Sequence, residues 1–246
     1  MPSDRGIVAG PGKTGGPDYV DNGRTNRVLA PHDEPLARPL LRGVLHGGAF
    51  AASCVIGVLF VAAAPDQRVL PALAFALSAT VMLGTSTLYH RIRWKRTAAR
   101  LWMRRADHAG IFLLIAGTYT PIGLISLHGS WRITILAIAW SGAAAAVALK
   151  LCWVAAPKWL SAVVGVALGW AGVAAMPQIV HHDGIAPVVL LAAGGLAYTA
   201  GAFVYAFRRP DPYPAVFGYH ELFHALTIGA LACQYVAVAF FVVRVG

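Results

Sequence analysis

The chain has 246 residues, of which 58% are hydrophobic and only 12% are charged, against about 25% charged in an ordinary soluble domain. This composition excludes a typical soluble protein and indicates a polytopic membrane protein, because the apolar residues come in long runs. The net charge of +10 would suit nucleic-acid binding only if the basic residues formed a footprint on a folded face. Here they separate the hydrophobic runs, so we expect no nucleic-acid partner.

Residues 1–41 are rich in Pro, Gly and charged residues and have no apolar periodicity, which predicts a disordered arm. No apolar core precedes a small-residue cleavage site, so the arm does not resemble a secretory signal peptide. Gly12-Lys13-Thr14 resembles the end of a phosphate-binding loop. That motif requires glycine where Ile7 stands, and no strand precedes it, so we expect no nucleotide site there.

Seven apolar runs follow within residues 42–246, and most are near the ~20 residues that cross a bilayer as a helix. The fifth is the shortest and is expected to end at Pro177. Backbone groups in lipid must be satisfied internally, so the sequence predicts an all-α bundle of seven transmembrane helices in the cell membrane. The expected spans are residues 43–64, 69–90, 106–127, 132–154, 159–176, 186–207 and 218–243.

The basic residues predict the orientation of the bundle. If the arm and the loops after spans two, four and six lie on one side, that side holds 17 of the 20 Lys and Arg residues. The positive-inside rule then places the N-terminus in the cytoplasm and the C-terminus outside.

Ionisable residues inside membrane spans are costly, and each is therefore a functional candidate. With the predicted orientation, six of them, all acids or histidines, fall at the cytoplasmic end of their spans. These residues are His46, His90, Asp107, His220, Glu221 and His224.

The spacing of the histidines indicates a metal site. His220 and His224 are four residues apart, so they share one helix face and can chelate one ion. His90 from the second span would complete a three-histidine set with an open fourth position, the arrangement of catalytic zinc. Asp107 would orient or deprotonate a water whose pKa the ion lowers to about 7. Ser86 shares a helix face with His90 and would hydrogen-bond His90 or the reacting oxygen.

Structural interpretations of the same residues remain open. Asp107 also suits an ion pair with Arg104 or Arg105, and serines in membrane helices often bond their own backbone. We interpret His46 as a packing or supporting residue. The other histidines are expected to be solvated or without a role in the site, and the cysteines to be small buried apolar residues; these are His32, His108, His128, His181, His182, Cys54, Cys152 and Cys233.

Residues 220–224 also fit the H-E-x-x-H motif of zinc proteases. Such enzymes need a third protein ligand, often an acid further along the chain, and none of the 22 residues after His224 is Asp or Glu. We therefore do not expect peptide hydrolysis. Glu221 would flank the ion without ligating it and would be a reserve general base.

Three blocks in this order resemble the hemolysin III family: Ser86-Thr-Leu-Tyr-His90, the run from Asp107 to Pro121, and His220-x-x-x-His224. This family is the bacterial branch of the progestin and adipoQ receptor group, within a superfamily that includes alkaline ceramidases. The resemblance covers roughly residues 40–246. It implies zinc held by the three histidines near the cytoplasmic face, Asp107 in contact with the zinc-bound water, and hydrolysis of lipid amides.

Two hypotheses follow. The first is a zinc-dependent hydrolase of a membrane lipid amide or ester, with Asp107 and Ser86 supporting the reaction. The second is a non-enzymatic membrane protein with structural zinc, either a sensor or regulator or a pore-forming cytolysin. In both, membrane lipids are the expected substrate or ligand.

Overall fold

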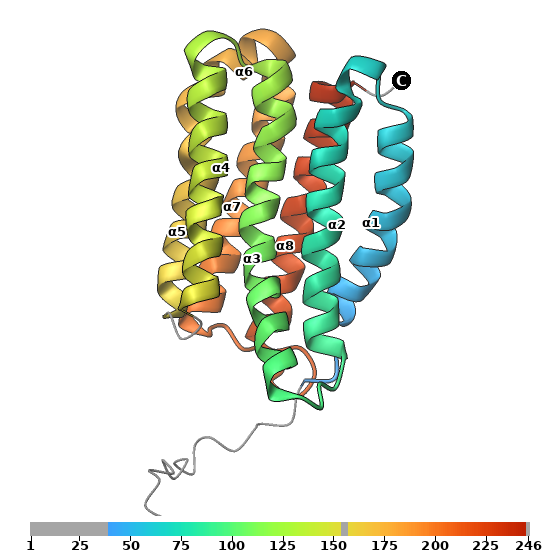
Figure 1. Cartoon of the computed structure of the whole chain (residues 1–246), viewed down its shortest axis with the longest axis vertical. Coiled ribbons are helices and arrows are strands. Elements are labelled where there is room, and N and C mark those ends of the chain that lie inside the picture. The colour runs from blue at the N-terminus through green and yellow to red at the C-terminus, as the bar shows by residue number, and fades with distance from the viewer. Residues whose placement is uncertain (1–38, 154–156, 245–246) are drawn as a thin grey trace, which may run out of the picture. The chain divides into compact units, whose positions relative to one another are not determined.

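The computed structural model describes residues 39–153 and 157–244. Over these residues the chain is helical, and the only β-type pairing among them is an isolated bridge between Tyr213 and Phe217. The α-helices lie side by side (Figure 1). They are α1 Val44–Ala62, α2 Val69–Arg91, α3 Thr97–Pro121, α4 Gly129–Cys152, α5 Lys158–Trp170, α6 Met176–Asp183, α7 Ile185–Phe207 and α8 Tyr219–Val236.

Short 3₁₀ or π-helical turns extend several of these helices, so the described residues contain seven helical segments long and apolar enough to cross a membrane. The prediction of an all-α protein with seven spans is confirmed. The segments are Val44–Ala62, Asp66–Arg91, Thr97–Ser126, Gly129–Cys152, Trp159–Asp183, Ile185–Phe207 and Tyr219–Val243.

Two spans differ from their expected bounds by more than three residues. The third begins at Thr97 rather than at residue 106, so Asp107 lies well inside α3 rather than at its start. The fifth does not end at Pro177. It passes through a 3₁₀ turn, Ala171–Ala175, into α6, where Pro177 occupies the first turn and needs no backbone hydrogen-bond donor. His181 and His182 are therefore on α6, and both are exposed, as expected of solvated residues.

The break between α5 and α6 leaves backbone groups that lipid cannot satisfy. Tyr119 of α3 satisfies two of them. Its hydroxyl donates to the Gly169 carbonyl at 2.7 Å and accepts from the Gly172 N–H at 2.9 Å. The Tyr119 hydroxyl thus supplies hydrogen bonds to two backbone groups at the 3₁₀ turn, which lipid could not supply.

The helices α2, α3 and α8 form the inside of the bundle. Their membrane segments have the largest buried shares, whereas α1, α5 and α7 mostly present apolar side chains outward. Glycines let the inner helices approach closely: a methyl group on Gly117 of α3 would overlap the Ser78 side chain of α2, and one on Gly110 would lie 3.1 Å from the Met82 Cα. The close packing at these glycines fixes the position of α3 relative to α2.

The glycines of the later spans divide into two groups. Gly172, Gly194 and Gly201 lie against side chains or backbone of neighbouring helices. At Gly165 and Gly169 of α5, by contrast, an added methyl group would meet nothing within 4 Å, and both residues line an internal cavity. These two glycines of α5 therefore leave the cavity open and do not bring α5 closer to a neighbouring helix.

Candidate metal centre

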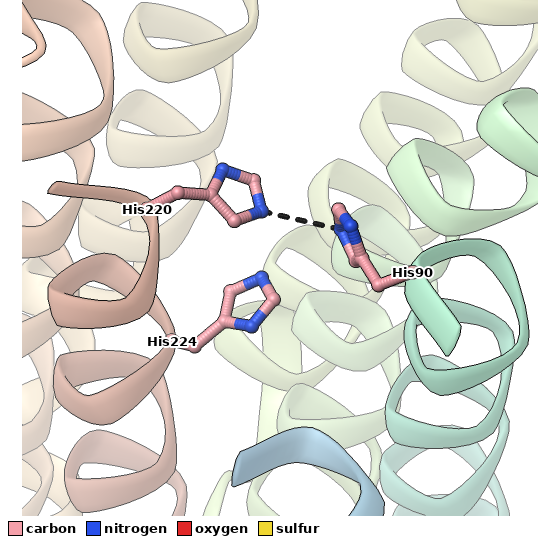
Figure 2. A group of neighbouring side chains, drawn as sticks. All are labelled: His90, His220 and His224. Atoms are coloured by element: carbon pink, nitrogen blue, oxygen red, sulfur yellow. Dashed lines mark hydrogen bonds between the residues drawn. The ribbon is translucent and has the colours of Figure 1, made fainter. Parts of the chain in front are cut away.

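Three imidazoles meet between α2 and α8 at one end of the bundle, which we call the histidine end (lower end in Figure 1). His90 lies in the last turn of α2, and His220 and His224 occupy the first two turns of α8. Figure 2 shows His220 and His224 one above the other on α8, with His90 opposite them. Each residue offers a ring nitrogen, and the three nitrogens lie within 4.8 Å of one another. Among the described residues this is the one group of three or more such ligands that converges so closely.

The separation of the nitrogens fits one shared ion. His90 Nε2 and His220 Nε2 are 3.2 Å apart. Two nitrogens at about 2.0–2.1 Å from a tetrahedral zinc ion stand about 3.3–3.4 Å from each other. His224, 2% exposed, closes the triangle from one turn below His220. The donor set is all imidazole, which suits zinc and several other transition metals. The structure thus supports a possible three-histidine metal site.

Asp107 reaches the cluster from α3. Its Oδ2 lies 3.6 Å from His90 Nε2, the same nitrogen that faces His220. A carboxylate that only oriented the ligand would contact the other ring nitrogen, Nδ1. Asp107 is therefore placed beside the open side of the cluster. Among the described residues neither Arg104 nor Arg105 is within ion-pair distance of it, so the alternative of a structural arginine pair is wrong.

Ser86 and His46 support the cluster from behind. The Ser86 hydroxyl, one turn before His90, lies 2.8 Å from His46 Nδ1 and also hydrogen-bonds the Asp107 side chain. The His46 ring stacks on the His224 ring with centroids 3.7 Å apart and planes 5° from parallel. Ser86 thus bonds side chains from two other helices, not merely its own backbone. The interpretation of His46 as a packing and supporting residue agrees with this stack.

Glu221 has a different role from the reserve base that the sequence suggested. Its side chain is 1% exposed, and its Oε2 accepts the Gly218 N–H at 3.0 Å, capping α8. Its Oε1 lies 2.6 Å from Arg42 Nε. The carboxylate is therefore occupied in fixing the start of α8, which carries His220 and His224.

Sequence reasoning missed this ion pair because residues up to 41 were interpreted as a disordered arm. Residues 1–38 lie outside the described part of the chain, but Leu40 and Leu41 donate backbone hydrogen bonds to Ala215 and Val216, in the loop before α8. Those bonds bring Arg42 to Glu221. The one sequence feature that points to this ion pair is Glu221 itself, an acid that lies between the candidate ligands His220 and His224.

A cavity of about 220 Å³ opens beside the cluster and runs through the bundle. His224 and Asp107 line it at the histidine end. Ile115, Ile135 and Ile179 line it further along, toward the opposite end. The candidate metal centre thus adjoins an internal space whose deeper wall is apolar.

Fold and site together define a multi-pass integral membrane protein with a three-histidine cluster among its helices. A family model described as "Haemolysin-III related" matches residues 35–235, so the chain belongs to the haemolysin III family, as its motifs suggested. In bacteria this places it in the cell membrane.

Individual relatives agree. The chain is 32% identical to "Hemolysin-3 homolog" of Bacillus subtilis (strain 168) over 171 residues, which is 70% of this chain and 76% of the relative. It is 31% identical to "Hemolysin-3" of Bacillus cereus over 64% of this chain and 68% of the relative. A more distant likeness, 29% identity over 68% of this chain and 80% of the relative, is to the "Heptahelical transmembrane protein ADIPOR2" of Oryza sativa subsp. japonica.

Proposed function

We propose that the protein is a zinc-dependent hydrolase that cleaves an amide or ester bond of a membrane lipid. The observation that carries the proposal is the position of Asp107, whose carboxylate lies 3.6 Å from the ligand nitrogen of His90 at the end of a largely apolar cavity. A purely structural metal site would need neither a carboxylate beside its open position nor an adjoining cavity.

When bound by His90, His220 and His224, zinc would supply Lewis-acid chemistry and water activation near neutral pH. The protein's own groups divide the remaining work. Asp107 holds water beside the open side of the cluster and accepts a proton from it. Ser86 keeps the Asp107 and His46 side chains in place, and the His46 ring fixes the orientation of His224.

The cavity supports a lipid rather than a water-soluble substrate. Its wall beyond the cluster is formed by side chains such as Ile115, Ile135 and Ile179, which suit an acyl chain. Gly165 and Gly169 keep that space open on the α5 side. A chain lying there would bring its amide or ester group to the histidine end.

A cytolytic role is the second candidate, and the observation that favours it is the name of the relative "Hemolysin-3" from Bacillus cereus. The apolar deeper wall of the cavity does not suit a hydrated pore. Leakage of liposomes that hold the purified protein, without turnover of any lipid, would favour this candidate over the hydrolase.

The hydrolase is tested by incubating zinc-loaded protein with amide- and ester-linked lipids in mixed micelles and measuring released fatty acid by mass spectrometry. We expect release that stops on chelation and returns when zinc is added back. A lipid panel that yields no fatty acid with metal-loaded, monodisperse protein would contradict the proposal.

A further inference from the structure

Lys150 is a basic residue in the wall of the cavity. It lies in the last turn of α4, only 5% of it is exposed, and it lines the same cavity as Asp107. Its charged neighbour is Arg104 of α3, which repels it. Among the described residues no carboxylate lies within ion-pair distance of Lys150.

Two donors in this region lack an acceptor. The Ser161 hydroxyl of α5 lines the cavity and is buried without a hydrogen-bond partner among the described residues. The Nε of Arg104 is likewise buried and makes no hydrogen bond within that part of the chain. Burying charged or polar donors without partners costs free energy, so such groups normally have a counter-ion or a bound ligand. The ligand that satisfies two cations and a hydroxyl is an anion.

We propose that Lys150, with Arg104 and Ser161 beside it, binds the phosphate of a lipid headgroup. Lys150 is in the last turn of a membrane span, at the level where lipid phosphates lie. The same cavity offers an apolar wall for the acyl chain of that lipid. The substrate class that follows from this subsite rests on the proposed function: a hydrolase with this subsite would act on lipids that carry phosphate.

The test is lipid binding, which needs no turnover. Delipidated protein is titrated with dioleoylphosphatidylglycerol in a neutral detergent, and binding is measured from the rise in melting temperature. We expect saturable stabilisation of the wild type, of Lys150→Arg and of Asp107→Asn. Lys150→Met should bind roughly 10- to 100-fold more weakly, the usual effect of losing a charge-assisted hydrogen bond. Lys95→Met, which removes an exposed lysine, is the matched control and should bind like the wild type.

Without lipid, Lys150→Met should be at least as stable as the wild type, because the substitution removes the repulsion between Lys150 and Arg104. A loss of stability would mean that Lys150 has a structural role and would overturn the proposal. Equal lipid binding by Lys150→Met and Lys95→Met would do the same. Inorganic phosphate that reproduces the lipid's stabilisation at equal concentration would refute the headgroup assignment. Because Asp107→Asn binds without reacting, failure of the hydrolase and failure of this subsite give different results.

Discussion

Replacing Asp107 with asparagine is expected to lower lipid turnover by about 10²–10⁴-fold while leaving the bound metal in place. The amide keeps the size of the side chain but cannot accept a proton, and general acid–base groups contribute about that factor. Asp107 Oδ2 lies 3.6 Å from His90 Nε2, and the three histidines already make up the protein ligand set of an open catalytic zinc site. Turnover per metal-loaded protein is the quantity to measure.

Asp66→Asn provides the matched control, since Asp66 is exposed in the turn before α2 at the other end of the bundle. It should keep the wild-type rate. If Asp107→Asn retained most of the rate, Asp107 would not be the base. If it lost the metal along with the rate, Asp107 would be a ligand instead.

Filling the cavity should remove turnover of long-chain lipids without touching the metal centre. Gly165 lines the cavity, and a Cβ there meets nothing within 4 Å, so a side chain at this position begins in open space. We expect Gly165→Leu to lower the rate for long acyl chains at least about tenfold. That is the size of effect that a mispositioned substrate produces. Short-chain analogues, which need less of the cavity, should be affected much less.

Gly229→Leu is the control for the helix-stabilising effect of losing a glycine. Gly229 also has open space at its Cβ position, but it is exposed on α8 and does not line the cavity. Its variant should process long and short chains like the wild type. Equal loss for all chain lengths in Gly165→Leu would show that the cavity does not hold the acyl chain.

The number and type of the spans were predictable from sequence, because one helix needs about twenty apolar residues and the chain contains seven such runs. The residues at which the spans begin and end were less predictable. The arginine-rich start of α3 is too polar to appear as a membrane span, and the continuation of the fifth span past Pro177 depends on Tyr119, which is distant in sequence. The predicted orientation of the termini stays a prediction.

The histidine cluster was predictable from the i,i+4 spacing of His220 and His224 and the shared depth of His90. Three features of the site were not. The stack of His46 on His224 and the burial of Lys150 depend on how helices rotate against each other. The Arg42–Glu221 ion pair depends on the backbone bonds of Leu40 and Leu41 to the loop before α8. A single sequence carries the depth of a residue in the membrane but not its direction around the helix.

The most direct test of the metal centre is the metal content of detergent-purified protein by elemental mass spectrometry. Wild type is compared with His90→Ala, His220→Ala and the control His181→Ala, which alters an exposed histidine on α6. We predict about one zinc per chain in the wild type and the control, the stoichiometry of a single three-histidine site. Both His90→Ala and His220→Ala, although on different helices, should lose it. A wild-type protein that stays free of metal after zinc is resupplied would contradict the shared site.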